Sequence, residues 1–319
     1  MSVRISTSGV HNAAIANMMR QQTQLSKTQQ QLASGLRFQT PADDPIAAAQ
    51  VLDFERTQSE LDQYGKNSQL LTTRLSAGEQ SMASIESLLQ RVRDLVIQAN
   101  GGGGDALARG AIATEIRARS QELMEIANRR DSSGEYLFAG YSTGTQPFAR
   151  TATGVAYQAD QGVRTLQVGT DQKIADGFSG SQVFMSIPEG NGTFTTAQGV
   201  HTGTGTIDTG ALVNASAWVR DTYTISFTAT GYEVRNSASA LVTSGAYTEG
   251  TAIQFNGVSV NVSGEPALGD TFTVAPAATE SIFDTLDGLA TMLTSLNDDP
   301  RSKSTLATSM SGSLQQIDQ

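Results

Sequence analysis

Residues that could carry out catalysis or hold a metal are few in this chain of 319 residues. It has no cysteine and only two histidines, His11 and His201, which fall in segments that we expect to form separate domains. The absence of cysteine removes disulfides, thiolate catalysis and zinc-thiolate sites. Two distant histidines supply little for a histidine metal site or a Ser-His-Asp triad. We therefore predict no enzymatic activity, no cofactor and no metal.

The pair Asp43-Asp44 could form an acid-base site or part of a calcium loop. Neither fits, because adjacent residues do not face one another and no further ligands follow at calcium-loop spacing. Asp44 before Pro45 instead suits a helix N-cap with proline at the first helical position, and Gly35 can take a positive φ and end the preceding helix. The stretch QLASGLRFQTPADDPIAAAQ, residues 31–50, is thus predicted to join two helices. The residues of this helix joint are Gly35, Pro41, Asp43, Asp44 and Pro45.

Charge and glycine content exclude further classes of function. A net charge of −10 argues against binding nucleic acid or an anionic membrane, since both require clustered cations. The glycine-rich segments GGGGD and GTGT lack the Lys-Ser/Thr of a phosphate loop, so we interpret them as turns. The first thirty residues lack the apolar core of a secretory signal, and no run is long enough to cross a bilayer. This alone suggests a cytoplasmic protein, but it leaves a dedicated export route open.

The elements that would position any site are mostly helices. Residues 46–99 carry two heptad rows that form one apolar seam, as in a coiled coil. Four glycines then break the helix, Asp105 offers a cap, and a second helix runs back to about residue 131. A third helical block follows residue 281 and resumes after NDDP. The two seam rows are Leu61, Ser68, Leu75, Met82, Leu89, Val96 and Tyr64, Leu71, Gly78, Ile85, Val92, Ala99. The later helical patterns are Ile112, Ile116, Leu123, Ile126; Leu286, Leu289, Leu293, Leu296; and Leu306, Met310, Leu314, Ile317.

The first helix has a narrow apolar stripe, which we call the arm stripe: Ile15, Met18, Leu25 and Leu32. Glutamines flank it on both sides. An ordinary solvated helix would show the same weak pattern. We favour a helix that becomes stable only against partner helices, because so thin a stripe buries too little area to order a lone helix. We predict that the arm stripe is an assembly interface.

Residues 140–278 differ in character, being rich in glycine and threonine with an alternation of period two. DTYTISFTATGYEVRN, AIQFNGVSVNVSG and GDTFTVAP predict strands, and Asn256-Gly257 predicts a hairpin turn. The predicted fold is mainly α with an all-β insertion: an elongated antiparallel helical bundle or coiled coil that carries a β-rich domain. We expect an N-terminal assembly arm at 1–44, a helical rod domain at 45–139 and 279–319, and the β-rich inserted domain at 140–278.

Two segments resemble a known family. QLASGLRFQTPADDPIAAA is similar to the joint between the first two helices of flagellins and flagellar hook-associated proteins. ANRRDSSGEYLFAG resembles the end of the helical domain in the hook-associated protein 3 family, the hook-filament junction proteins. The resemblance covers residues 1 to about 145, recurs weakly after residue 281, and says little about the β insertion. Pro41, Pro45 and GEYLFAG favour the junction family over flagellins.

The resemblance implies a structural subunit of the bacterial flagellum. Such a subunit would self-associate in a ring between hook and filament, beside a neighbouring hook-associated protein and flagellin. It would be extracellular, exported by the flagellar type III apparatus without a cleaved signal peptide, and held by an export chaperone beforehand. Family members usually end in a long C-terminal helix that pairs with the N-terminal one, whereas this sequence stops at Gln319. A flagellin-like filament subunit and a generic coiled-coil adaptor or adhesin are the alternatives.

Overall fold

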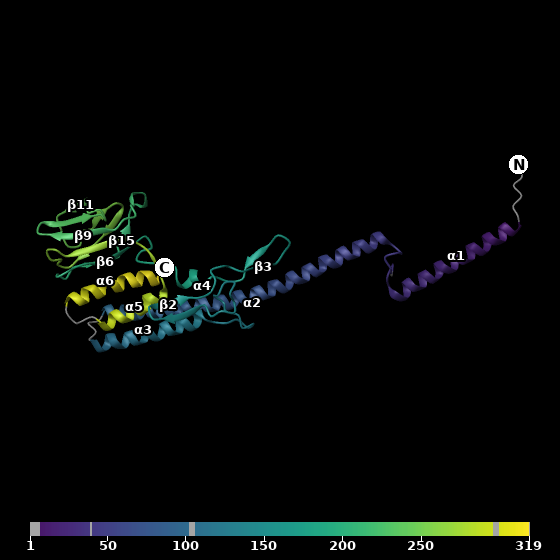
Figure 1. Ribbon diagram of the computed structural model, residues 1–319, viewed down its shortest axis with the longest axis horizontal. Coiled ribbons are helices and arrows are strands. Elements are labelled where there is room, and N and C mark those ends of the chain that lie inside the picture. The colour runs from purple at the N-terminus through teal and green to yellow at the C-terminus, as the bar shows by residue number, and fades with distance from the viewer. Residues whose placement is uncertain (1–6, 39, 102–105, 296–299, 319) are drawn as a thin grey trace. The chain divides into compact units, whose positions relative to one another are not determined.

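The computed structural model describes residues 7–38, 40–101, 106–295 and 300–318 (Figure 1). The chain divides into two compact units. The first comprises residues 1–67 with 168–170, and the second comprises residues 68–167 and 171–319. Each unit is described by itself.

The first unit contains helix α1, Thr7–Ser34, and the beginning of helix α2, Pro45–Gly101. The joint between them was predicted from Gly35 and Pro45, and the helix ends confirm it. No residue of this unit whose burial the structure describes is buried. Its helices therefore gain almost nothing from apolar burial within the unit.

In the second unit, α2 packs with three further helices around one hydrophobic core. These helices are α3, Ala106–Ala127; α5, Ile282–Ser295; and α6, Pro300–Ile317. Helix α3 lies along α5, as Figure 1 also shows. The predicted returning helix is confirmed, and its four pattern residues, Ile112, Ile116, Leu123 and Ile126, are all buried. Among the described residues, no helix is long and apolar enough to cross a membrane.

The predicted seam of α2 is only partly a core. Leu61 is 61% exposed, whereas Leu71 is buried and Val92 and Val96 have no exposed surface. The difference follows from the partners, because the core cluster takes its α2 residues from Ala77 onward, where α3, α5 and α6 supply facing side chains. Asp105 and Leu296, assigned from sequence to a cap and to a core, lie outside the described residues.

The segment after α3 folds onto the helices. It holds four short strands, the helix α4 and a fifth strand. Phe148 and Phe184 from this segment pack edge to face and meet Phe283 of α5 in the same hydrophobic core. The elements are β1, Phe148–Thr151; β2, Gly154–Tyr157; β3, Thr165–Gln167; β4, Lys173–Ala175; α4, Gly180–Phe184; and β5, Ile187–Pro188.

A buried ion cluster fixes this segment to α2. The Arg74 guanidinium lies 3.1 Å from Asp131 Oδ2 and also contacts Glu135 and Asp176. Arg164 Nε donates to Asp176 Oδ2 at 2.6 Å. The hydrogen bond from Arg74, together with the charge of Arg164, lowers the pKa of Glu135 despite its partial burial. Breaking such a cluster from one side leaves an uncompensated buried charge, so it locks the segment in place.

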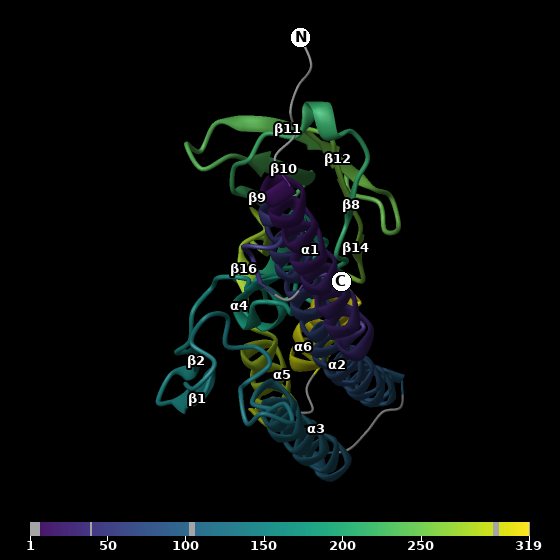
Figure 2. The same cartoon turned by 90° about the vertical axis from the view of Figure 1, so that its right-hand side faces the viewer.

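The remaining strands form a second hydrophobic cluster that is separate from the helical core. A five-stranded sheet has the order β11-β10-β9-β15-β6, and a three-stranded sheet has the order β12-β13-β8. Side chains of both sheets, such as Ile225, Phe272 and Val258, share the cluster. Figure 2 shows β8 and β12 beside β9 and β10. The strands are β6, Phe194–Gln198; β7, Thr206–Ile207; β8, Ala211–Leu212; β9, Tyr223–Thr228; β10, Gly231–Arg235; β11, Leu241–Gly245; β12, Ile253–Phe255; β13, Val258–Val260; β14, Val262–Ser263; β15, Thr271–Pro276; and β16, Thr279–Glu280.

The predicted hairpin at Asn256-Gly257 is confirmed. Phe255 pairs with Val258, which leaves a two-residue turn between β12 and β13. Asn256 and Gly257 have φ values of 44° and 79°. Two positive φ values in a row define the turn that matches the twist of paired strands, and Asn-Gly is the sequence that adopts it most readily.

Candidate assembly interface

The arm stripe is exposed along α1. Ile15, Met18, Leu25 and Leu32 are 42%, 69%, 60% and 85% exposed. At about 100° of rotation per residue, the four side chains fall within an arc of about 100° on one helix face. The structure thus brings the four predicted residues together on a surface that no described residue of the unit covers.

The arm stripe is too small to hold α1 in the helical state alone. Full burial of each side chain would contribute at most about 1.5–3 kcal/mol. Fixing each backbone residue costs about 1–2 kcal/mol before hydrogen bonds are counted, and α1 has 28 residues. Isolated helices are marginal in water unless an apolar face is packed. No described residue of the first unit is buried, so the unit itself does not supply the missing apolar contact.

The helix joint has the predicted geometry. Gly35 has a φ of 69°, the left-handed conformation that ends α1. Asp44 Oδ1 accepts a hydrogen bond from Ala47 N at 3.0 Å, and Pro45 is the first residue of α2. Asp43 N donates to Thr40 O at 3.0 Å, which closes a tight turn with Pro41 at its second position. The joint is an ordered structure made by its own residues.

Ion pairs hold the joint against the end of α1. Lys27 Nζ lies 3.1 Å from Asp43 Oδ1, and Arg37 Nη2 lies 2.6 Å from Asp44 Oδ2. The hydrogen bond from Lys27, followed by those from Thr40, lowers the pKa of Asp43. Because these groups are exposed, the pairs contribute little free energy, and their effect is to orient the joint. The carboxylates of Asp43 and Asp44 thus have separate partners. Among the described residues, no group of three or more His, Cys, Asp or Glu residues could hold a metal ion.

Sequence reasoning missed further exposed apolar residues of the first unit. The first unit also exposes Met19, Leu36, Ile46, Leu52 and Phe54, with Phe54 72% exposed. Phe54 lies seven residues before Leu61 and therefore continues the same heptad row toward the helix start. Extending the row backward from Leu61 would have found it. Exposed apolar side chains are thus found on α1, on the helix joint and on the start of α2.

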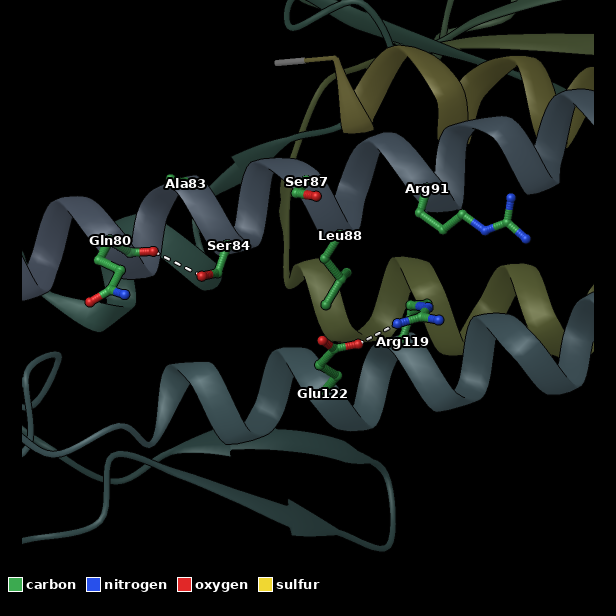
Figure 3. Close-up of a pocket in the computed structure, with 8 residues that line it drawn as sticks. All are labelled: Gln80, Ala83, Ser84, Ser87, Leu88, Arg91, Arg119 and Glu122. Atoms are coloured by element: carbon green, nitrogen blue, oxygen red, sulfur yellow. Dashed lines mark hydrogen bonds and ion pairs between the residues drawn. The ribbon is translucent and has the colours of Figure 1, made fainter.

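The second unit has a groove between α2 and α3 (Figure 3). Its α2 wall carries small side chains, Ala83, Ser84 and Ser87, and Leu88 lines it as well. On the α3 side Arg119 and Glu122 form an ion pair at 2.5 Å. The groove holds none of the residues assigned to a site from sequence. The charged groups that line it all have partners, since Arg91 pairs with Glu115 and Arg119 pairs with Glu122.

Comparison with known families defines the class of protein. Residues 5–143 match the model of the bacterial flagellin N-terminal helical region. Residues 197–276 match the model of the flagellar hook-associated protein 1, D2-like domain. Together with an exposed helical arm and a β-rich part, these matches define a flagellin-like flagellar protein.

Individual relatives narrow this class. Flagellar hook-associated protein 3 of Salmonella typhimurium is 30% identical over 185 residues, and the match spans 58% of this chain and 58% of that protein. The crystal structure of Xanthomonas campestris FlgL is 32% identical with a TM-score of 0.77, covering 82% of this chain and 87% of that chain. The flagellar junction protein FlgL of Legionella pneumophila is 30% identical with a TM-score of 0.78, covering 86% of this chain and 88% of that chain. The chain belongs to the flagellar hook-associated protein 3 (FlgL) family.

Proposed function

We propose that this chain is a structural subunit of the bacterial flagellum that forms the junction between hook and filament and performs no catalysis. The Legionella pneumophila relative is a flagellar junction protein, and this chain covers 88% of it at 30% identity. The observation that carries the proposal is the exposure of the arm stripe. A helix that lacks packing partners in its own unit is what an assembling subunit requires.

The proposed partners follow from the same surface. The arm stripe would pack against neighbouring copies in a ring, and against an adjoining hook-associated protein and flagellin. Before assembly an export chaperone would cover it, because an uncovered apolar surface promotes aggregation. The subunit would reach the outside of the cell through the flagellar export apparatus without a cleaved signal peptide.

We also propose a division of labour along the chain. Residues 1–44 form the assembly arm, residues 45–139 and 279–319 form the helical domain, and residues 140–278 form the β-rich domain. The contacts of Phe148 and Phe184 with Phe283 support assigning the first part of that last range to the helical domain. A boundary near residue 190 fits the separation of the two hydrophobic clusters, since the second cluster begins at Phe194.

A variant of the arm stripe tests the proposed function. Leu25→Ser with Leu32→Ser should abolish incorporation at the tip of the hook in cells that lack the wild-type chain, and motility should be lost. The melting curve of the purified chain should stay unchanged, because these side chains are already exposed. The amount of subunit in sheared flagella is measured by immunoblotting, beside the amount exported.

The matched control changes the opposite face of α1. Thr23→Ser with Gln24→Ser alters two exposed side chains that lie about 130° around the helix from the centre of the arm stripe, and it should leave incorporation intact. Normal incorporation of the leucine variant would exclude the arm stripe as the assembly interface.

The alternative is a flagellin-like filament subunit, which the match of residues 5–143 to the flagellin N-terminal region keeps open. Stoichiometry separates the two roles. A junction subunit is a scarce component of sheared flagella, whereas a filament subunit is their most abundant protein. Quantitative gel analysis of sheared flagella from a tagged strain decides between them.

A further inference from the structure

Helix α2 contains two glycines away from its ends, Gly65 and Gly78. A side chain would fit at either position, because a Cβ atom built on either glycine meets no atom within 4 Å. Close packing within the described residues therefore does not require glycine there. Glycine is, after proline, the residue least favourable to a helix interior, since it loses the most backbone freedom when the helix forms. Each glycine thus weakens α2 without a gain in packing.

Gly65 lies among other weak helix formers. Residues 64–68, which we call the hinge segment, have the sequence YGKNS, and among them only Lys66 has a high helix propensity. Asn67 and Ser68 favour turns and helix caps, because their side chains compete for backbone hydrogen bonds. Helices bend sharply at few kinds of place, and paired glycine and serine residues are one of them. The local sequence therefore favours a bend of α2 at the hinge segment.

The packing of α2 changes just after the hinge segment. Residues 45–70 are all exposed or half-buried, and Leu71 is the first buried residue of the helix. Arg74 follows, held in the buried ion cluster with Asp131 and Asp176. At 1.5 Å of rise per residue, this cluster holds the helix about 14 Å beyond the glycine of the hinge segment. Helix α2 is therefore packed from Leu71 onward and not before it.

Gly78 has different surroundings. It lies between Arg74 and Ser81, which are 6% and 0% exposed, and the adjacent Ala77 packs against the hydrophobic core. Packing on both sides fixes the direction of the helix at this glycine, whatever its helix propensity. The two glycines are therefore a matched pair, one in an unpacked part of α2 and one in a packed part.

The chain passes between the two units at two places. The first is α2, after residue 67, and the second is the turn between β3 and β4, since residues 168–170 group with the first unit. Strands β3 and β4 pair with each other, and no third strand joins them among the described residues. A lone two-stranded hairpin is marginally stable, so it can follow a movement of the first unit.

We propose that α2 bends at the hinge segment, which gives the first unit a range of directions in the free chain. Hinges are a few residues that absorb a change in backbone angles while the elements beside them stay rigid. The use of this hinge rests on the proposed function. A subunit between hook and filament contacts two different structures, and a bend in α2 lets the arm stripe reach partners whose positions differ.

Distances between spin labels on α2 test the hinge. The chain has no cysteine, so introduced cysteines place labels only where they are intended. Gln58→Cys with Ser76→Cys joins two exposed sites across Gly65, and we call it the hinge pair. A straight helix would place these sites about 27 Å apart on one face. We expect a broad distribution of distances by pulsed electron paramagnetic resonance, and Gly65→Ala should narrow it.

Two control pairs separate a hinge from general looseness of the helix. Thr72→Cys with Gln90→Cys joins exposed sites at the same separation across Gly78. Its distribution should be about half as broad as that of the hinge pair, since packing prevents a bend there, and Gly78→Ala should leave it unchanged. Ala49→Cys with Gln63→Cys lies wholly before the hinge segment and should give a narrow distribution at about 21 Å.

Three outcomes of the spectroscopy would overturn the proposal. The first is an equal breadth for the hinge pair and for the pair across Gly78, which would mean that α2 is equally stiff at both glycines. The second is a broad distribution for the pair before the hinge segment, which would mean that this part of α2 is unfolded. The third is a hinge pair that stays broad in Gly65→Ala, which would place the bend elsewhere.

Incorporation into flagella tests what the hinge is used for. At equal export, Gly65→Ala should lower the amount of subunit in sheared flagella, whereas Gly78→Ala should not. Normal incorporation of Gly65→Ala would exclude a use of the hinge in assembly. Absence of the wild-type chain from sheared flagella would exclude the proposed function instead, and the distances measured on the free chain would still decide whether α2 bends.

Discussion

At the scale of single residues, Asp270 shows how one carboxylate organises the β-rich part. It is 1% exposed and accepts hydrogen bonds from the backbone N–H groups of Thr202 at 2.6 Å, Gly203 at 3.1 Å and Ala267 at 2.7 Å. Burial acts to raise the pKa of Asp270, but these hydrogen bonds outweigh it and leave the pKa below 3.8. The ionised carboxylate therefore pins two loops together.

The sign of this shift predicts a dependence of stability on pH. A carboxyl group with a lowered pKa in the folded state contributes stability above its unfolded pKa, and that stability is lost as pH falls through the folded pKa. Asp270→Asn should lower the free energy of unfolding at pH 7 by about 1–3 kcal/mol. The difference from the wild type should narrow as the pH falls below 3.8. Urea unfolding at a series of pH values measures both effects.

Asp171→Asn is the control for that series, because it removes the same charge from an exposed residue. Surface changes of this kind usually alter stability by less than about 0.5 kcal/mol. If the free energy of unfolding differed by the same amount between Asp270→Asn and the wild type at all pH values, the charge of the Asp270 carboxylate would not contribute to stability.

At the scale of elements, α2 is one helix with two kinds of surface. Leu61, in the first unit, is 61% exposed, and Leu95, in the second unit, is 2% exposed. Val96 holds the same heptad position as Leu61 and has no exposed surface, because only the second part of α2 has facing side chains from other helices. The apolar period predicts which face can be buried, and the presence of partners decides whether it is.

The two leucines give a matched pair of substitutions in one helix. Leu95→Ala should cost about 2–5 kcal/mol of stability, because it leaves a cavity in a packed core. Leu61→Ala should cost less than about 0.5 kcal/mol in the isolated chain. Chemical denaturation followed by circular dichroism gives both values. A comparable loss for both variants would contradict the proposal that the first part of the seam is uncovered.

Local signals in the sequence were enough for most of the elements. Gly35, Pro45 and the Asn256-Gly257 turn act through their own backbone preferences, so the helix joint and the hairpin could be predicted. The order of the strands could not, because pairing such as β15 beside β6 and β9 depends on contacts distant in sequence. The ion cluster around Arg74 was missed for the same reason, since Asp131 and Asp176 lie far from it along the chain.

The candidate interface was predicted in part. The arm stripe could be found because exposure of a thin helical stripe follows from its own composition. Phe54 continues the heptad row of Leu61 and could have been found by extending that row, whereas Ile46 falls outside the row and had no such signal.

At the scale of the whole molecule, the β-rich part divides between two hydrophobic clusters. Phe148, Val155 and Phe184 belong to the helical core, whereas Phe194 and Phe272 belong to the strands. A deletion that is designed from composition alone would cut through the first cluster. A deletion that is designed from packing would begin after β5 and end before β16.

Two deletions test this division. Removal of residues 191–277, with a short linker, should leave a folded helical part and retain export and assembly. Removal of residues 141–279 should also remove Phe148 and Phe184, which exposes part of the core around Phe283 and should prevent stable folding. Melting curves and the presence of each variant in sheared flagella are the measurements. Equal stability of the two variants would show that the segment from residue 141 to residue 190 adds nothing to the helical core.

The uncovered α1 also bears on how long a free copy survives in the cell. Arg20, Lys27, Arg37 and Arg56 are all exposed, in a unit where no described residue is buried. Cleavage of such a segment depends on how often it opens, and a helix without packed partners opens readily. We expect copies that fail to find a partner to be degraded first, and those that find one to persist. The proposed assembly surface would then also select which copies remain.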